Sequence, residues 1–425
     1  MNNNSFPEAE NIITGIQKPW IQERRFYVED FGKDIEENIR PAVDAAIEKC
    51  AAEGGGRVRI PMGRFLCRGP IRLQSGVELH LSDGSFLRFS SNPKHYTPNV
   101  YCRWEGINLY NYSPMIYALN AKDIAITGKG VIDGGADIWS TFRREQKESQ
   151  AEAWRAGAVA VPLKNRQFGE THKLRPSMLH LVNCRRILIE DVMLTNSPFW
   201  MIHPVYSKHI TIRGVACNSL FINNDGADID SCEEVLIENC RFTNGDDAIV
   251  MKSGRDRDGR TTGIPTRNVV IRNCDIPEAL HGFAVGSELS GGVENIYVQN
   301  LRMGKINGEA IQFKSNKDRG GFINNIHIKD VSVRHAGRHL IFLTNDYGKF
   351  REGRTPTEFR GITLEHISCG YAEKALHFHG LAENPFCNIR LNEVHVEKSP
   401  CPVSCRENCG NTVIDNVSVN GVNIT

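Results

Sequence analysis

The stretch that decides the fold is Val235-Leu-Ile-Glu-Asn-Cys240, in which apolar residues alternate and a polar corner residue precedes the last one. This pattern returns along most of the chain at intervals of 23 to 36 residues. Its clearest copies are Ile187-Leu-Ile-Glu-Asp-Val192, Ile210-Thr-Ile-Arg-Gly-Val215, Val269-Val-Ile-Arg-Asn-Cys274, Ile296-Tyr-Val-Gln-Asn-Leu301, Ile326-His-Ile-Lys-Asp-Val331, Ile362-Thr-Leu-Glu-His-Ile367 and Ile389-Arg-Leu-Asn-Glu-Val394. Alternation with a period of two is typical of strands, and a repeat of this length indicates a solenoid with one coil per copy.

The fifth position of each copy predicts how the coils turn. It is most often Asn, Asp or Gly, as in Asp191, Gly214 and Asn239. These residues tolerate a left-handed backbone at a tight corner. Because the copies show no apolar spacing of 3.6 residues, they argue against a helical solenoid and predict an all-β, parallel β-helix.

Two segments depart from the repeat. Residues 35–52 read as an amphipathic helix, which we expect to cap the first coil, because an uncovered solenoid end exposes a sheet edge. Residues 139–175 interrupt the repeat with a charged, helix-prone stretch at 143–156, which we interpret as an insertion over one face. We therefore predict one catalytic domain over 1–425, with an N-terminal segment at 1–66 and a final coil and tail at 395–425.

Composition excludes several classes of partner. The chain has 40% hydrophobic and 24% charged residues with a formal net charge of +1, so no overall field favours nucleic acid or a membrane. We expect neither as a partner, and we expect a monomer or weak oligomer. The first ten residues lack the apolar core of a signal peptide. The sequence as it stands thus predicts a cytoplasmic protein, or a periplasmic or secreted one if a leader was trimmed.

The 13 cysteines are not spaced like a metal site or a disulfide framework. Cys184, Cys217, Cys240 and Cys274 sit beside apolar strand positions, so we expect them in the core. The tail residues Cys401, Cys405 and Cys409 are spaced to bind metal or to form a bridge, but no histidine at ligand spacing lies nearby. We favour no site there and expect no metal and no cofactor.

Polar residues gather on a second ladder of short strands between the repeat copies. Asp225 precedes one rung, and Asp246 with Asp247 precedes the next, about one coil later. His281 and Lys314 fall on the two rungs that follow. Stacking of coils predicts that these side chains share one outer strip.

Three crowded carboxyls raise one another's pKa, so that one stays protonated and acts as a general acid. Glycoside hydrolysis needs that acid together with a carboxylate that activates water or attacks. Read singly, the stretches at 223–226 and 244–247 are ordinary Asn/Asp/Gly turns. Their occurrence on consecutive rungs with His281 and Lys314 favours the catalytic interpretation.

The ordered set Asn223-Asn-Asp-Gly226, Gly245-Asp-Asp247, His281-Gly282 and Lys314, with the pattern at 54–65, resembles the polygalacturonase family of glycoside hydrolases, family 28. The resemblance covers nearly the whole chain. It implies a right-handed parallel β-helix, no metal cofactor, and inverting hydrolysis of α-1,4 galacturonosyl bonds in pectic polysaccharide.

The resemblance also implies roles for the polar residues. Asp246 matches the general acid, and Asp225 with Asp247 matches the pair that activates water. His281 matches the histidine that keeps the acid in its working protonation state, although Leu280 stands where the family has glycine. Lys314 matches a lysine that binds the substrate carboxylate.

Gln312 replaces the family's arginine two residues before that lysine, which removes a bidentate carboxylate partner. The stretch at 314–321 is similar to one in exo-polygalacturonases, and with the insertion it predicts an exo-acting enzyme. Further candidate substrate ligands are Lys252, Arg319, His203 and Tyr347, with Arg255 and Lys317 as extra cations. We expect Trp200 in the core and Arg257 and Arg260 on a solvated loop face, and the same solvated position stays open as an alternative for Arg255.

Three alternatives stay open. A pectate-type lyase shares the fold but needs calcium-binding carboxylates and a cationic base. A non-catalytic, glycan-binding β-helix would use the aspartates only as turn residues. Within the hydrolases, Gln312 keeps open a substrate such as rhamnogalacturonan or decorated pectin fragments.

Overall fold

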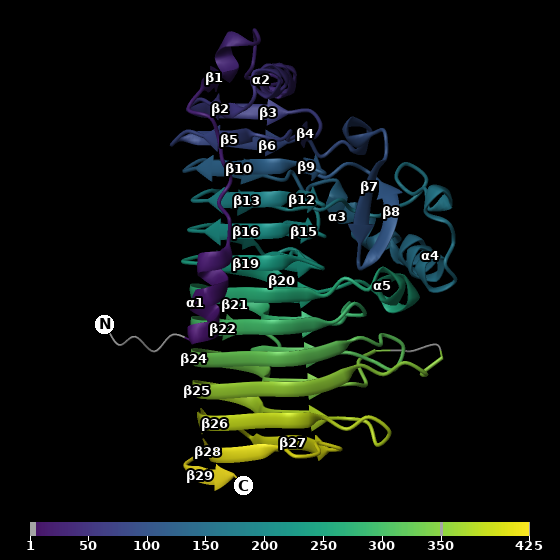
Figure 1. Cartoon of the computed structure of the whole chain (residues 1–425), viewed down its shortest axis with the longest axis vertical. Helices are drawn as coiled ribbons and strands as arrows, with labels where there is room; N and C mark the ends of the chain where they lie inside the picture. Colours follow the sequence, from purple (N-terminus) through teal and green to yellow (C-terminus); the bar gives the residue numbers. More distant parts are fainter. Residues whose placement is uncertain (1–5, 349–351, 425) are drawn as a thin grey trace.

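The repeat copies form one ladder of stacked parallel strands in the computed structural model, which describes residues 6–348 and 352–424. β13 (Arg185–Glu190) pairs in parallel with β16 (Lys208–Arg213), and β16 pairs in parallel with β19 (Glu233–Glu238). Each copy thus lies directly above the next along the long axis (Figure 1). The predicted right-handed parallel β-helix is confirmed.

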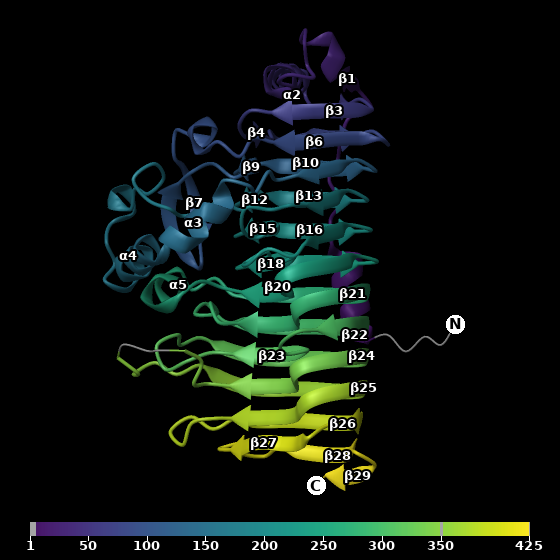
Figure 2. The same ribbon diagram turned by 180° about the vertical axis from the view of Figure 1, so that it is seen from behind.

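Each coil contributes strands to three ladders. In the second half of the chain, long strands continue through the corners from one ladder to the next. The first ladder begins with β1 (Arg25–Tyr27), β2 (Gly56–Ile60), β5 (Val77–Leu81) and β10 (Lys122–Gly128). The second holds β3 (Gly63–Cys67), β6 (Ser85–Phe89), β11 (Val131–Asp133), β14 (Met193–Thr195) and β17 (Ala216–Ser219). The third, seen in Figure 2, holds β4 (Ile71–Arg72), β9 (Ile116–Leu119), β12 (Leu179–Val182), β15 (Ile202–Val205), β18 (Ala227–Asp230), β23 (Ile311–Lys314) and β27 (Cys401–Glu407). The long strands are β20 (Arg241–Lys252), β21 (Thr266–Gly286), β22 (Val293–Ile306), β24 (Phe322–Thr344), β25 (Glu358–His379), β26 (Cys387–Lys398) and β28 (Val413–Val419), and β29 (Val422–Ile424) pairs antiparallel with β28.

The alternation in each copy separates core from surface. Val235 and Ile237 are fully buried in the main core cluster, whereas Leu236 points outward between them. Cys184, Cys217, Cys240 and Cys274 are buried and free, as predicted. Cys401, Cys405 and Cys409 are free and partly exposed.

The corner residues adopt the left-handed backbone that the sequence predicts. Asn239, Asn273 and Asn300 have φ of 56°, 55° and 55°, and His366 and Glu393 do the same at 52° and 53°. Side-chain amides also link successive corners, because Asn300 Nδ2 donates to Asn273 Oδ1 at 2.7 Å. The coil therefore imposes the corner geometry even where the residue is not Asn, Asp or Gly.

A capping helix covers the first coil, as predicted, but it is shorter than expected. α2 (Arg40–Ala52) buries Val43, Ala46 and Ile47 against the core, and residues 35–39 form turns instead. A second helix, α1 (Pro7–Gly15), was not predicted. It packs on the outside of the solenoid, where its Ala9 covers Leu236 and Tyr297 (Figure 1).

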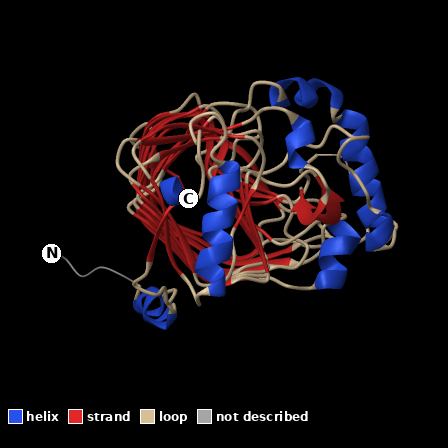
Figure 3. Cartoon of the chain, turned by 90° about the horizontal axis from the view of Figure 1, so that it is seen from above, coloured by secondary structure: helices blue, strands red, loops and turns tan. Residues whose placement is uncertain are grey.

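Helices gather on one side of the solenoid, beyond the ends of the third ladder (Figure 3). Two of them, α3 (Trp139–Glu145) and α4 (Lys147–Ala158), fall within the insertion, and α5 (Asp256–Thr262) follows β20. Three short 3-10 helices span Val28–Asp30, Pro93–Tyr96 and Leu163–Asn165. The hairpin of β7 (Val100–Trp104) and β8 (Ile107–Asn111) packs beside α4. Among the described residues, no helix has the length and apolar character needed to cross a membrane.

Candidate active site

Coil stacking brings the three predicted aspartates to one place. The backbone N–H of Gly226 donates to the carbonyl of Asp247 at 2.9 Å, so Asp225 and Asp247 lie on adjacent rungs. Asp247 is in register with His281 on the next rung, and Gly286 is in register with Lys314 on the one after. The predicted strip is therefore present.

A cavity of 190 Å³ opens over this strip. The residues that line it are Glu105, Gln150, Trp154, Trp200, Asn223, Asp225, Asp246, Asp247, Lys252, Arg255, Ser287, Glu288, Lys314 and Tyr347. They come from the hairpin, the insertion and six successive coils. The cavity is thus the meeting point of the ladder and the segments that interrupt it.

Two of the aspartates have opposite electrostatic surroundings. Burial and the neighbouring charge of Asp247 raise the pKa of Asp246. Burial also acts to raise the pKa of Asp247, but the charges of Lys314, His281 and Lys252 outweigh it and hold that pKa below its usual value. Lys314 Nζ lies 2.9 and 3.2 Å from the two carboxylate oxygens of Asp247. The structure thus pairs a carboxyl group of raised pKa with one of lowered pKa, the combination that acid–base catalysis uses.

The third aspartate shares its surroundings with a buried neighbour. Burial and the charges of Asp228 and Asp246 raise the pKa of Asp225 well above its usual value. Lys252 Nζ lies 3.8 Å from Asp225, 3.6 Å from Asp228 and 3.2 Å from Glu288. Burial would raise the pKa of Glu288, but Lys252 and Arg255 lower it well below the usual value.

The charges of the lining residues do not balance if every group is ionised. Five carboxyl groups line the cavity, at Glu105, Asp225, Asp246, Asp247 and Glu288, against three cations at Lys252, Arg255 and Lys314. Burial and neighbouring charges raise the pKa values of the first three acids, whereas the cations lower those of the last two. These opposite shifts reduce the excess of negative charge around the three cations.

His281 has its own carboxylate partner. Its Nδ1 lies 2.9 Å from Glu309 Oε2, and burial, which would raise the pKa of Glu309, is outweighed by bonds to His281 and His339 that lower it. One potential ligand atom from each of Asp246, Asp247 and His281 lies within 4.8 Å of the other two, close enough for the three to bind one metal ion. The Lys314 ammonium already neutralises Asp247 there, so a cation would meet repulsion at this point.

A wall closes one side of the cavity. Glu105, at the turn between β7 and β8, accepts hydrogen bonds from Gln150 Nε2 and Trp154 Nε1 of α4, all at 2.9 Å. The guanidinium of Arg255 lies 4.1 Å from the Trp154 ring centroid and pairs with Glu288. Glu105 has a φ of 42°, unusual for a residue other than glycine. The turn thus holds the Glu105 carboxyl group at the cavity wall through a strained backbone conformation.

The base of the insertion also supports the candidate acid. Arg175 is fully buried and donates through Nη2 to Asn223 Oδ1 at 2.7 Å. Asn223 in turn donates through Nδ2 to Asp246 Oδ2 at 3.3 Å. Burial lowers the pKa of Arg175 to about 10, still well above neutral pH. A charged arginine therefore anchors the loop that touches Asp246.

Comparison with known proteins places the chain in a family. The model of the glycosyl hydrolases family 28 matches residues 106–418. The chain belongs to family 28. A probable polygalacturonase of Vitis vinifera is 28% identical over 84% of this chain and 71% of its own length. An endo-polygalacturonase of Pectobacterium parmentieri is 26% identical over 77% and 76% of the two chains.

Among solved structures, an exopolygalacturonase from Thermotoga maritima superposes with a TM-score of 0.90 at 33% identity. It covers 96% of this chain and 95% of its own. The relatives thus include both endo- and exo-acting members of family 28. The geometry of this cavity must therefore decide between the two modes.

Not all of the predicted substrate ligands of this family 28 chain reach the cavity. Lys252, Lys314 and Tyr347 line it. Arg319 does not, because its side chain is buried and Nε donates to the Ser287 carbonyl at 2.7 Å. Gln312 is also buried outside the lining, and its Oε1 has no hydrogen-bond partner among the described residues.

His203 was expected to reach the substrate and Trp200 to pack in the core, but it is Trp200 that reaches the cavity. His203 is fully buried, lies 3.5 Å from Asp230 and packs against the His180 ring at a tilt of 45°, so it supports Asp230 and does not meet the predicted terminal sugar. Trp200 packs in the core as predicted, but it also lines the cavity, with Lys252 Nζ 4.5 Å from its ring centroid. Arg255 is buried at the wall, which corrects its reading as a solvated residue.

Sequence reasoning missed Glu105, Gln150, Trp154 and Glu288. The hairpin had a usable signal, since alternating residues at 100–104 and 107–111 flank the two-residue turn Glu105-Gly106. Glu288 follows the His281 rung much as Lys252 ends the rung before it. No sequence signal places Gln150 or Trp154, because only the packing of the insertion brings them to the cavity.

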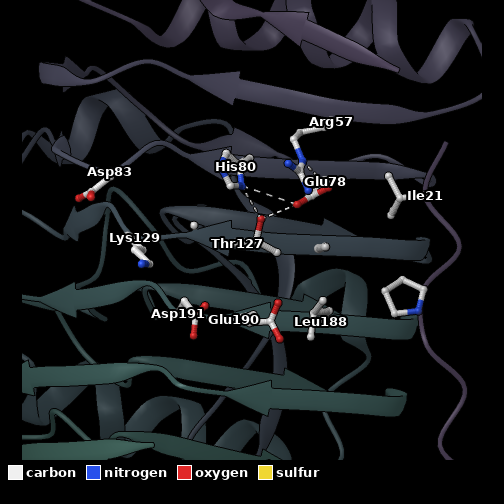
Figure 4. Close-up of a pocket in the computed structure, with 13 residues that line it drawn as sticks. Ile21, Arg57, Glu78, His80, Asp83, Thr127, Lys129, Leu188, Glu190 and Asp191 are labelled. Atoms are coloured by element: carbon white, nitrogen blue, oxygen red, sulfur yellow. Dashed lines mark hydrogen bonds and ion pairs between the residues drawn. The ribbon is translucent and has the colours of Figure 1, made fainter. Parts of the chain in front are cut away.

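A larger cavity of 470 Å³ lies on the outer face of the first ladder, far from the catalytic strip (Figure 4). Its central groups are paired with one another. Thr127 lies between His80 and Glu78, and Arg57 Nε donates to Glu78 at 2.9 Å. Burial opposes these contacts, which nevertheless lower the pKa of Glu78 to about 2. This self-contained network explains the polar lining without a ligand.

Proposed function

We propose that this family 28 protein is an exo-acting hydrolase that releases the terminal galacturonate from polygalacturonate or its oligosaccharides. The name of the structural relative, an exopolygalacturonase, supports this proposal. So does the cavity itself, which combines a carboxyl group of raised pKa, one of lowered pKa and three cations. Pectic polysaccharide is then the only partner that the proposal requires.

The charge balance of the cavity carries the choice of sugar. Three cations, Lys252, Arg255 and Lys314, line the cavity beside Asp247 and Glu288, the two acids whose pKa values are lowered. A galacturonate carboxylate would give these buried cations a further anionic partner. A neutral sugar would offer them none.

The reaction proposed is a single displacement. Asp246 gives its proton to the glycosidic oxygen as the bond to the anomeric carbon breaks. Asp247 takes a proton from the attacking water, and Asp225 on the adjacent rung holds that water in place. The water oxygen bonds to the opposite face of the anomeric carbon, so the configuration inverts. Lys314 keeps Asp247 ionised until the proton arrives.

The wall supports exo action. Glu105, Gln150 and Trp154 line one side of the cavity and are hydrogen-bonded to one another, so they would block a chain that continues past it. The insertion and the hairpin, both outside the repeat, supply this wall. An endo-acting enzyme needs an open groove on both sides of the scissile bond.

A charge comparison tests the proposal. Trigalacturonate should be turned over with a kcat/KM about 100-fold above that of the same trimer carrying a methyl ester on its terminal sugar, since the ester offers the buried cations no charged partner. Asp246→Asn should turn over neither substrate while keeping the wild-type melting temperature. Equal rates on both trimers would remove the charge argument, and turnover by Asp246→Asn would remove the assignment of the acid.

A further inference from the structure

A further open cavity, of 570 Å³, lies on the flank of the solenoid between the β7–β8 hairpin and the ends of β9, β12 and β15. It is lined by Tyr101, Asn108, Tyr110, Leu119, Asn120, Leu163, Val182, Asn183, Tyr206, Thr262 and Ile264. None of these lining residues, all within the described part of the chain, carries a charge. The lining of this cavity is therefore uncharged, whereas that of the catalytic cavity is rich in charged groups.

The floor of this flank cavity is apolar and aromatic. Tyr117, Val182 and Val205 form a separate buried cluster, against which Tyr101 and Tyr206 pack. The rings of Tyr101 and Tyr110 meet edge to face, with centroids 6.0 Å apart and planes at 63°. Tyr101, Tyr110 and Tyr206 all remain partly accessible, so solvent reaches their rings.

The rim adds exposed apolar side chains and amides. Leu119 is 42% exposed, Leu163 38% and Ile264 42%. Asn183 Nδ2 donates to Asn120 Oδ1 at 2.6 Å, and both residues are exposed with further donors and acceptors to offer. Aromatic rings with a few fixed amides are the usual lining of a small-molecule site.

Two buried arginines near this lining are already paired. Arg166 Nη1 lies 2.8 Å from Asp258 Oδ1, and Arg103 Nη1 lies 2.7 Å from Asp230 Oδ1. Arg103 also lies 4.5 Å from the ring centroid of Tyr206. The lining itself therefore offers an acidic sugar no cation in exchange for its lost water.

We infer that the flank cavity is an accessory binding site for an uncharged oligosaccharide. A pyranose presents C–H groups on its faces, which suit the electron-rich faces of tyrosine, and hydroxyls on its edge, which suit the asparagine amides. The β7–β8 hairpin joins the two sites, because Tyr101 and Tyr110 lie at its base and Glu105 at its tip. The site would hold neutral sugar chains near the catalytic cavity. The inference does not depend on the proposed reaction, since binding is measured without turnover.

Isothermal titration calorimetry with β-1,4-galactotetraose and with xylotetraose tests the inference. At least one of them should bind the wild-type protein, and Tyr110→Ala should weaken that binding about tenfold. The matched control is Tyr371→Ala, a partly exposed tyrosine on β25 outside the cavity, which should bind as the wild type does. Turnover of trigalacturonate should be unchanged in Tyr110→Ala.

Three results would overturn the inference. One is that neither neutral tetrasaccharide binds. Another is that tetragalacturonate, added to the inactive Asp246→Asn variant, displaces the bound neutral sugar, because the ligand would then lie in the catalytic cavity. The last is a concentration-dependent dimer, seen by sedimentation, that Tyr110→Ala dissociates, because a second copy of the chain would then cover the tyrosines.

Discussion

Replacing Lys314 by Met removes the ammonium that lies 2.9 and 3.2 Å from the two oxygens of Asp247. Coulomb's law with an effective dielectric constant of about 20 gives an attraction of about 6 kcal/mol at 2.9 Å. Desolvation of both buried groups offsets part of it, so the loss of one partner is expected to cost about 3–5 kcal/mol. Asp247 is then a buried carboxylate without its main cation.

The cost should depend on pH with a definite sign. In the wild type the lowered pKa of Asp247 contributes stability above the unfolded value of about 3.9, and this is lost as the pH falls through the folded pKa. In Lys314→Met burial raises that pKa, so the carboxylate destabilises the fold at neutral pH and takes up a proton in acid. The difference in unfolding free energy between the two proteins should therefore shrink toward low pH.

Activity should follow the same titration. The acid limb of the pH profile of kcat should move to higher pH in Lys314→Met, because the base protonates sooner, and kcat at the wild-type optimum should fall about 100-fold or more. Urea unfolding at two pH values and the pH profile measure both effects. The control is Lys317→Met, whose partly exposed pair with Glu383 at 3.1 Å is worth about 0–1 kcal/mol. An unmoved acid limb with pH-independent destabilisation would refute the reasoning.

Three further outcomes follow from the site. Activity should fall on the alkaline side as well, at the raised pKa of Asp246, because the acid then loses its proton; a rate that stays level as the pH rises well above neutral would contradict this. Excess EDTA should leave turnover unchanged, since Lys314 already serves Asp247 as its cation, whereas a loss restored by calcium would favour the lyase alternative. Arg103→Met should lower the unfolding free energy by about 3–5 kcal/mol, because it leaves Asp230 buried without the guanidinium that lies 2.7 Å away. The control is Arg144→Met at an exposed position, which should change the unfolding free energy by less than about 0.5 kcal/mol. Equal effects of the two substitutions in urea unfolding would count against the buried pair.

The solenoid was predictable because its information is local and repeated. Each copy, such as Val235 to Cys240, carries its own strand alternation and its own corner residue, and the structure places the copies in register. The order of Asp225, Asp247, His281 and Lys314 on the rungs follows from that register alone. Spacing along the chain therefore became proximity in space.

The parts that the sequence did not predict depend on packing between distant segments. Trp154 reaches the cavity only because α4 docks on the hairpin, and its hydrogen bond to Glu105 joins residues 49 positions apart. α1 covers Leu236 across a still longer separation. His203 contacts Asp230 because the two residues lie on neighbouring rungs. The alternation of apolar and polar residues does not show which outward-facing side chains are buried by other segments. The repeated sequence pattern contains no information on such contacts.

The most direct test of the account is to follow the products of polygalacturonate hydrolysis in chelator from the first seconds, together with the viscosity of the solution. The account predicts saturated monogalacturonate as the sole early product, while the viscosity stays almost unchanged, because Glu105, Gln150 and Trp154, which line the cavity, are proposed to block a continuing chain. A rapid fall in viscosity with mixed oligomers would contradict exo action. Unsaturated ends would contradict hydrolysis itself.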